Sequence, residues 1–240
     1  MSLVAAMAAH AARRAARLKR EAAAEDPREL VRREPRGLAQ LLARPTPRRV
    51  AEVRFASADE GFRVPREQAN AEEAALRARA ASAGGAHAIS VWTERHFHAG
   101  DWTHLSAARR ALPDAVLIAR DLVVDEYQLD LARARGADAV TLWGAVSGQT
   151  TPALAAAARA RGLGVIVEAA NAAQLELARL CGADAVLAPS RPPGRPAPDM
   201  SAARAVAARG RGLPVFIEAE TSEGLVSVRT LDAWAPADLG

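Results

Sequence analysis

Three glutamates of the chain, Glu52, Glu168 and Glu218, each lie within an apolar stretch. A carboxylate that is buried without a partner is strongly unfavourable, so each needs a cationic partner or a chemical task. Carboxyl groups are also common general acids and bases. These three residues are therefore the first candidates for catalysis.

Three arginines, Arg54, Arg120 and Arg191, end or follow apolar stretches in the same way. Carboxylates and guanidinium groups around one opening would form a site for an anionic ligand. A structural ring of ion pairs is the alternative. Catalysis would require shifted carboxyl pKa values, which depend on the fold.

A repeat reveals the elements that must position these residues. The phrases Gly-Ala-His-Ala-Ile (85–89) and Gly-Ala-Asp-Ala-Val (136–140 and 182–186) each join a helix-ending glycine to a short apolar run. Such runs predict strands near 49–55, 87–93, 114–120, 138–144, 164–169, 184–189 and 213–219. Amphipathic segments between them predict helices, among them 71–83, 129–135, 152–161, 172–180 and 201–209.

Strands that alternate with helices require right-handed crossovers and a parallel sheet. Seven such units predict an α/β fold, a (β/α)8 barrel of the TIM type, in which polar residues at the strand ends meet at one mouth. A doubly wound sheet is the alternative. It usually has a glycine-rich phosphate loop after its first strand, and residues 57–61 (Ser-Ala-Asp-Glu-Gly) lack that pattern.

The C-terminal part predicts an incomplete or irregular eighth unit. After the seventh strand, residues 221–240 are too few for a helix and a further strand–helix unit, although 225–231 alternates like a strand. A sheet edge left open there could pair with a second copy or with another protein. We expect an N-terminal helical extension over 1–47 that packs on a barrel over 48–240.

The composition excludes several classes of protein. Aromatic residues make up only 4% of the chain, which disfavours a protein that binds single-stranded nucleic acid. The sequence contains no run of 18 apolar residues, so no membrane span is predicted. The net charge is +4, but the arginines scatter among acidic residues and do not gather on one face. Cys181 is alone, so no disulfide framework is predicted. We expect a cytoplasmic protein that binds neither nucleic acid nor a membrane.

Several motifs, in the right order, resemble the indole-3-glycerol phosphate synthase family. Residues 51–57 (Ala-Glu-Val-Arg-Phe-Ala-Ser) are similar to the family's Ala-Glu-Val-Lys-Lys-Ala-Ser. Residues 89–94 (Ile-Ser-Val-Trp-Thr-Glu), with Phe97 and Gly100, resemble its Leu-Ser-Val-Leu-Thr-Glu and Tyr-Phe-x-Gly. Residues 120–128 (Arg-Asp-Leu-Val-Val-Asp-Glu-Tyr-Gln) resemble its Lys-Asp-Phe-Ile-Ile-Asp-Pro-Tyr-Gln. The resemblance extends to about residue 220.

The family closes an indole ring on carboxyphenylamino-deoxyribulose phosphate, with loss of CO2 and then water. The resemblance implies that Glu52 and Glu168 take the two catalytic carboxylate positions and Glu218 a substrate-binding one. It also implies that Arg191 lies beside the carboxylate-bearing ring. The other substrate-binding residues that we expect are Arg54, Ser57, Phe97 and Trp143, and we expect no cofactor and no metal.

The chain also departs from the family pattern. Arg120 lies where the family has a lysine general acid, and an arginine is a poor proton donor near neutral pH. Arg54 replaces another lysine. Asp59, Glu60 and Glu220 place negative charge where the substrate phosphate would lie.

Two histidines could supply new chemistry. On an extended segment His96 and His98 would share one face, where Glu52 or Glu94 could complete a metal site. A loop pair without metal is the plainer interpretation. His98, with an ordinary pKa of about 6.5, could instead be a general acid or base. Trp143 could pack either an aromatic ligand or the barrel core.

These departures lead us to expect a repurposed lyase or cyclase. It would cyclise, dehydrate or decarboxylate a non-phosphorylated anionic or aromatic substrate, with Glu52, Glu168, Arg120 and His98 as catalytic residues. A non-catalytic barrel that binds a ligand or a partner protein is one alternative. The family reaction itself, with Arg120 as an electrostatic clamp, is the other.

Overall fold

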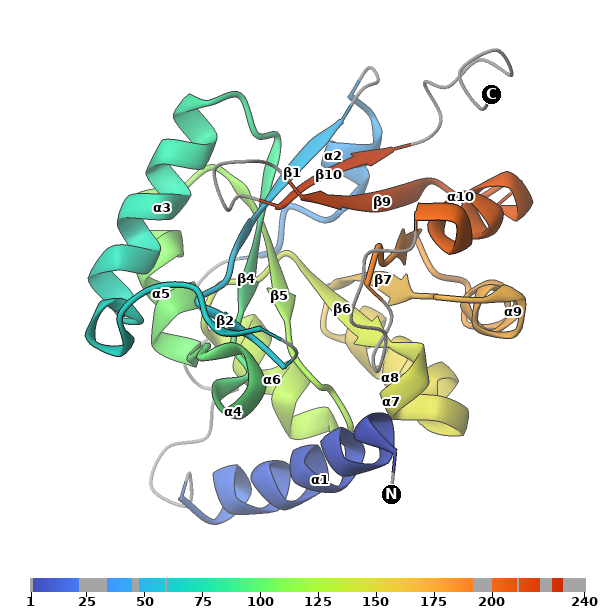
Figure 1. Ribbon diagram of the computed structural model, residues 1–240, viewed down its shortest axis with the longest axis horizontal. Coiled ribbons are helices and arrows are strands. Elements are labelled where there is room, and N and C mark those ends of the chain that lie inside the picture. Colours follow the sequence, from blue (N-terminus) through green and yellow to red (C-terminus); the bar gives the residue numbers. More distant parts are fainter. Residues whose placement is uncertain are drawn as a thin grey trace.

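The computed structural model describes residues 2–21, 34–44, 48–58, 60–191, 200–210, 212–220 and 226–230, with residues 219–220 and 226–230 as backbone only. Within these segments a ring of strands is surrounded by helices (Figure 1). The ring consists of β1 (Arg49–Val53), β4 (Ala88–Trp92), β5 (Val116–Arg120), β6 (Ala139–Trp143), β7 (Gly164–Glu168), β8 (Ala185–Ala188), β9 (Val215–Glu220) and β10 (Val226–Thr230). A small hairpin of β2 (Ala56–Ser57) and β3 (Gly61–Phe62) follows β1.

In the part of the chain that the structure describes, the longer helices outside the ring are α3 (Ala71–Ala83), α5 (Trp102–Ala111), α6 (Glu126–Ala134), α8 (Thr151–Ala160), α9 (Ala172–Leu180) and α10 (Met200–Arg209). The shorter helices α4 (Arg95–His98) and α7 (Gly144–Ser147) follow β4 and β6. In the described residues before the barrel, the structure has α1 (Leu3–Glu21) and α2 (Ala39–Leu42). The described chain thus has the predicted TIM-type architecture.

The strands close into a barrel in the order β1, β10, β9, β8, β7, β6, β5, β4. All neighbours pair in parallel except β10, which lies antiparallel between β9 and β1. An antiparallel return needs only a short connection, whereas a parallel one needs a dozen or more residues. The eighth unit is therefore irregular but not missing. Of the alternatives for the eighth unit, irregular closure holds in the described chain, because β10 occupies the edge where a partner chain could have paired.

Local signals explain most of the helix boundaries. Asp125 begins α6 with a capping box, because its side chain accepts from the Tyr127 N–H while Gln128 reaches back, so α6 begins three residues before the predicted helix. Gly136, at a φ of 93°, turns the chain after α6 into β6. Helix α5 is not among the helices that the amphipathic pattern singles out, because its first turns contain Thr103, His104 and a serine, which are weak helix formers.

The barrel interior is filled in layers. At the amino ends of the strands, Leu38 and Leu41 from the segment around α2 plug the opening and form a buried cluster with side chains of the barrel interior. The middle layer is mostly apolar and contains Ser90, Ile118, Thr141, Ile166, Leu187 and Phe216. The layer at the carboxyl ends is charged and aromatic, and it contains Glu52, Trp92, Arg120, Trp143, Glu168 and Glu218.

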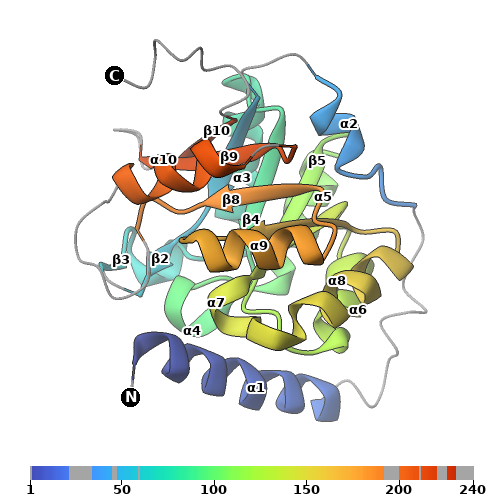
Figure 2. The same cartoon turned by 90° about the vertical axis from the view of Figure 1, so that its right-hand side faces the viewer.

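Helix α1 crosses the opposite end of the barrel, where the strands have their carboxyl ends (Figures 1 and 2). Arg14 holds it there. Its Nη1 donates to both carboxylate oxygens of Asp121 at 2.7 and 2.8 Å, and its Nη2 donates to the carbonyl oxygen of Thr93 at 2.7 Å. Met7, on the same helix, is fully buried in a cluster with Trp92. The N-terminal helix is thus a roof over the mouth of the barrel.

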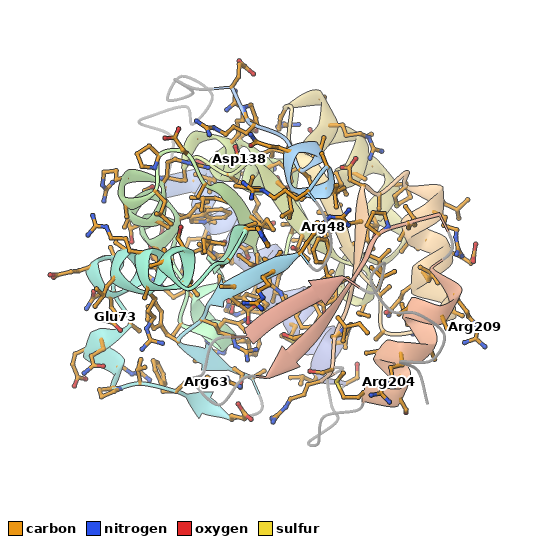
Figure 3. All side chains as sticks on the ribbon, turned by 90° about the horizontal axis from the view of Figure 1, so that it is seen from above. Arg48, Arg63, Glu73, Asp138, Arg204 and Arg209 are labelled. Atoms are coloured by element: carbon orange, nitrogen blue, oxygen red, sulfur yellow. The ribbon has the colours of Figure 1, made fainter. Side chains whose placement is uncertain are left out.

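Charged side chains spread over the outer helices. Figure 3 shows Glu73, Arg204 and Arg209 around the periphery, on α3 and α10. Glu73 pairs with Arg77 one turn further on, at 2.8 Å between Oε1 and Nε. None of the helices in the described segments combines the length and apolar character needed to cross a membrane.

Replacing Leu41 by alanine tests the plug. Leu41 is fully buried, so we expect the free energy of unfolding to fall by about 2–5 kcal/mol in urea titrations. Leu180→Ala is the matched control. Leu180 is 81% exposed on α9, and its loss should change stability by less than about 0.5 kcal/mol. Equal losses would show that α2 does not plug the barrel.

Replacing Arg14 by methionine tests the anchor of α1. Asp121 would keep a buried charge without its cation, so we expect a loss of about 3–5 kcal/mol of unfolding free energy. Arg17→Met removes an arginine from the same helix, but Arg17 and its partner Glu21 are 54% and 63% exposed. That control should lose no more than about 1 kcal/mol. A small loss for both variants would contradict the anchoring role.

Candidate active site

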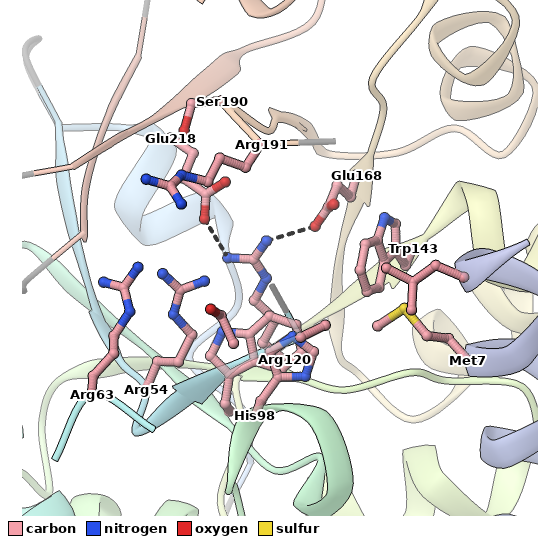
Figure 4. Close-up of a pocket in the computed structure, with 14 residues that line it drawn as sticks. Met7, Arg54, Arg63, His98, Arg120, Trp143, Glu168, Ser190, Arg191 and Glu218 are labelled. Carbon is pink, nitrogen blue, oxygen red and sulfur yellow. Dashed lines mark hydrogen bonds and ion pairs between the residues drawn. The ribbon is translucent and has the colours of Figure 1, made fainter. Parts of the chain in front are cut away.

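A pocket lies between the carboxyl ends of the strands and α1 (Figure 4). It encloses about 550 Å³ of space between atoms, part of which is open to solvent. Its lining combines two residues of α1 with residues at the ends of strands and in the loops that follow: Leu3, Met7, Arg54, Ser57, Ala58, Arg63, Trp92, His98, Arg120, Trp143, Glu168, Ser190, Arg191 and Glu218.

Arg120, the last residue of β5, lies at the centre of this pocket. Its Nη1 contacts Glu52 Oε1 and, at 3.3 Å, Glu218 Oε1, while its Nη2 lies 2.7 Å from Glu168 Oε2. The indole ring of Trp92 lies against the guanidinium at 4.6 Å. Burial disfavours the charge, but the three carboxylates outweigh it and raise the pKa of Arg120 further above its ordinary value. Arg120 is therefore a fixed cation.

The charges of the cluster do not balance when every carboxyl is ionised. Among the described residues, Arg120 and Arg54 face three carboxylates, with Arg54 Nε at 3.4 Å from Glu52 Oε2. Burial raises the pKa of Glu168 to about 7, because the attraction of Arg120 is opposed by the charge of Glu218. Burial alone would raise the pKa of Glu52 too, but Arg120 and Arg54 bring it below its ordinary value. One carboxyl can thus hold a proton near neutral pH while another stays ionised.

One side of the pocket is aromatic and apolar. The imidazole of His98 stacks on Trp92, with ring centroids 3.5 Å apart and planes 11° apart. Trp143 meets Trp92 edge-on at 6.4 Å. Met7 and Trp143 lie on one side of the pocket, and Arg54, Arg63 and Arg191 lie across from them (Figure 4). These rings can pack against a flat aromatic ligand.

Glu94 shapes the segment after β4. Its carboxylate accepts from the backbone N–H groups of His96, Phe97 and His98 at 2.8, 2.7 and 3.2 Å. Burial would raise its pKa, but the contact with the His98 ring and these backbone bonds lower it to about 2. Residues 95–98 therefore form α4, and our expectation of an extended segment with both histidines on one face is wrong. His96 stacks on His10 of α1 at 4.5 Å.

His98 alone of the two faces the pocket. Its Nδ1 lies 3.2 Å from Glu94 Oε2, and burial lowers the pKa of its imidazole. The ring is therefore neutral at neutral pH. In the part of the chain that the structure describes, no three His, Cys, Asp or Glu side chains gather as they would around a metal ion.

The other side of the pocket is cationic. Arg54, Arg63 and Arg191 gather there (Figure 4). The carboxylate of Glu60, at the tip of the β2–β3 hairpin, pairs with both Arg63 and Arg191. Ser57 Oγ lies 3.4 Å from the same carboxylate. An anionic group that enters the pocket from this side would meet guanidinium groups.

The fold brings most of the predicted site residues together. The pocket lining includes Arg54, Ser57, His98, Arg120, Trp143, Glu168, Arg191 and Glu218. Glu52 lies behind Arg120 and Trp92, whose indole N–H donates to it at 2.7 Å. Phe97 is not among the lining residues, and its ring meets His10 edge-on at 5.4 Å. The tasks of these residues stay predictions.

Sequence reasoning missed six lining residues, namely Leu3, Met7, Ala58, Arg63, Trp92 and Ser190. Trp92 follows Ser90 by two residues on the same strand, and alternation along β4 could have placed both inside the barrel. Leu3 and Met7 are four residues apart and share one face of α1. Nothing in the sequence indicates which element that face covers.

A ring of mostly parallel strands with a polar pocket at their carboxyl ends is typical of (β/α)8-barrel enzymes. The fold therefore defines a TIM-type barrel, and the pocket in its mouth is the candidate ligand site. A solved structure of 3-hexulose-6-phosphate synthase shares this fold, with a TM-score of 0.51 at 24% identity over 62% of this chain and 75% of that chain.

The chain belongs to the indole-3-glycerol phosphate synthase family, which it matches over residues 4–192. It is 43% identical over 110 residues to "Indole-3-glycerol phosphate synthase 2" of Streptomyces coelicolor, covering 45% of this chain and 42% of that protein. It is 34% identical over 151 residues to the indole-3-glycerol phosphate synthase of Methanopyrus kandleri, and this match covers 63% of this chain and 58% of that protein. The chain spans about half the length of the curated relatives it matches.

Our expectation of a barrel repurposed for a non-phosphorylated substrate is wrong. The family match and these relatives carry the name of the family reaction, and nothing in them indicates a different one. In the fold, Glu60 does not face the pocket as an unpaired charge, because its carboxylate contacts Arg63 and Arg191. Asp59 and the side chain of Glu220 lie outside the described residues.

Unfolding at two pH values tests the pKa of Glu168. Its pKa is about 7 in the folded state and 4.5 ordinarily, so the folded state keeps a proton that the unfolded state loses. The stability that Glu168 confers therefore falls as pH rises from about 4.5 through 7. Glutamine does not titrate, so Glu168→Gln should not lose this stability. Relative to the unmodified protein, its free energy of unfolding in urea titrations should rise by on the order of 2 kcal/mol from pH 5 to pH 8.5.

The control for this titration is Glu176→Gln, which removes a glutamate that pairs with Arg179 on the surface of α9. Its stability relative to the unmodified protein should be the same at both pH values. If the difference in unfolding free energy between Glu168→Gln and the unmodified protein is the same at both pH values, the raised pKa of Glu168 is contradicted.

Proposed function

We propose that this protein catalyses the indole-3-glycerol phosphate synthase reaction, in which carboxyphenylamino-deoxyribulose phosphate closes to the indole with release of CO2 and water. The observation that supports this best is the cluster at the pocket floor. There Arg120 holds Glu52, Glu168 and Glu218 together, next to the aromatic rings of Trp92 and Trp143. Family membership supports the same reaction.

The pocket suits the two kinds of group on this substrate. Its phenyl ring would lie against Trp143, with Met7 of α1 closing the slot from above. The substrate also carries a carboxylate and a phosphate, and both are anionic. Arg54 and Arg191 supply cationic donors on the opposite side of the pocket. Guanidinium groups bind carboxylate and phosphate oxygens well because their donors form a planar fork.

Glu168 is the residue that we assign to proton transfer toward the keto oxygen. That oxygen leaves as water, so it must take up protons during the reaction. With a pKa of about 7, Glu168 is protonated in about half of the molecules at neutral pH. A carboxyl with this pKa can give a proton and take it back. It can therefore serve as the general acid that a permanently charged arginine cannot be.

Arg120 then has an electrostatic task. Its guanidinium donates hydrogen bonds and stays charged, so it stabilises negative charge that develops on the keto oxygen as the ring closes. Glu52 holds Arg120 in place, because its oxygens face Arg120, Arg54 and Trp92 and it does not line the pocket. His98 is neutral and faces the pocket, so we assign it to take up the proton that the ring loses when it becomes aromatic.

Indole fluorescence after addition of carboxyphenylamino-deoxyribulose phosphate tests this function. We expect turnover by the unmodified protein, with kcat falling above pH 7 as Glu168 loses its proton. Glu168→Gln should lower kcat by about 10²- to 10⁴-fold, which is the usual contribution of a general acid. Glu176→Gln on α9 should leave kcat unchanged.

An Arg120→Lys variant separates charge from geometry. Lysine keeps the positive charge but loses the planar fork that contacts three carboxylates, so we expect lower kcat with substrate still bound. Absence of indole formation by the unmodified protein, at substrate concentrations that saturate binding, would exclude the proposed reaction.

A further inference from the structure

Glu60 lies in an unusual position for a surface carboxylate. Its Oε1 contacts Arg191 and its Oε2 contacts Arg63, and both arginines line the pocket. A carboxylate that bridges two guanidinium groups in this way is bound as an anionic ligand would be. The protein therefore occupies part of its own cationic site.

The contact also joins two distant parts of the barrel mouth. Glu60 belongs to the β2–β3 hairpin after β1, whereas Arg191 follows β8, and the two residues are 131 positions apart in the chain. In the barrel, β10 and β9 lie between β1 and β8. The Glu60–Arg191 pair thus bridges the ends of these strands, beside Glu218 on β9.

We propose that Glu60 competes with an anionic group of the substrate for Arg63 and Arg191 and must leave them when the substrate binds. This inference rests on the proposed function only in naming the substrate. The carboxylate of Glu60 and a ligand carboxylate or phosphate are similar groups. Each presents anionic oxygens that can accept hydrogen bonds from the two arginines.

The exposure of the three side chains makes such an exchange feasible. Glu60 is 35% exposed and each arginine 21% exposed, so the displaced carboxylate can return to water without a buried charge being left behind. A partly exposed ion pair is easier to separate than a fully buried one, which keeps displacement reversible. Glu60 would then set the affinity of the site and exclude anions that bind too weakly to displace it.

A Glu60→Gln variant tests this inference, because glutamine keeps the shape and removes the charge. We expect it to bind substrate about three- to tenfold more tightly, seen as a lower KM. Calorimetry with 2-aminobenzoate, which carries the ring and carboxylate of the substrate, should show a dissociation constant lowered by the same factor. Unchanged or weaker binding would overturn the inference, since Glu60 would then only hold the arginines in place.

Two controls isolate the effect of the contact. Glu67→Gln removes a charge from the same region, at a side chain with no ion pair to the described residues. Glu176→Gln also removes a glutamate that pairs with an arginine, but this pair lies on α9 and not at the pocket. Both should bind 2-aminobenzoate as the unmodified protein does. Thermal unfolding shows whether each variant folds, and Glu60→Ala repeats the test if the glutamine variant does not.

The two readouts separate this inference from the proposed function. If no variant turns over the substrate but Glu60→Gln binds 2-aminobenzoate more tightly, the reaction is excluded and the competition stands. If the unmodified protein turns over the substrate and Glu60→Gln changes neither KM nor the dissociation constant, the reaction stands and the competition is excluded.

Discussion

One buried guanidinium organises this protein. Arg120 ends β5, and Glu52, Glu168 and Glu218, on three other strands, contact it at the barrel mouth. Removing four ionisable groups from water is unfavourable unless each finds its partner, so the strand ends must meet in one arrangement. Burial, with the charges of Glu218 and Glu52, raises the pKa of Glu168 despite the attraction of Arg120. The constraint that fixes the barrel mouth therefore also provides a titratable group.

The surroundings of this cluster keep it effective. The apolar middle layer and the α2 plug exclude water from below, and α1 covers the mouth from the other side (Figures 1 and 2). Charges attract and repel more strongly where water is excluded. The anchor between Arg14 and Asp121 thus matters for the pocket as well as for stability, because it holds Met7 in the lining.

The position of a charge in the sequence does not show which group pairs with it in the fold. Read along the chain, Glu60 is a negative charge in the wrong place for a phosphorylated substrate. In the fold it is neutralised by Arg63, three positions away, and by Arg191, from the far side of the chain. Likewise Arg120 resembles a lost general acid only while it is considered alone. In the fold Arg120 lies beside Glu168, so Arg120 can supply the positive charge while Glu168 transfers the proton.

The sequence by itself determined the seven parallel strands and most of the polar residues at their ends. Glycine stops and apolar runs are local signals, which act over a few residues of the chain. Glu52, Glu168 and Glu218 could be singled out because a carboxylate in an apolar run needs a reason.

Only the tertiary structure decided which groups meet. It closed the barrel with an antiparallel β10, turned residues 95–98 into a helix capped by Glu94, and placed Phe97 outside the pocket lining. It also separated the pKa values of Glu52 and Glu168, two residues of the same type. Burial, strand partners and charge neighbours come from residues distant in the chain, so no local pattern contains them.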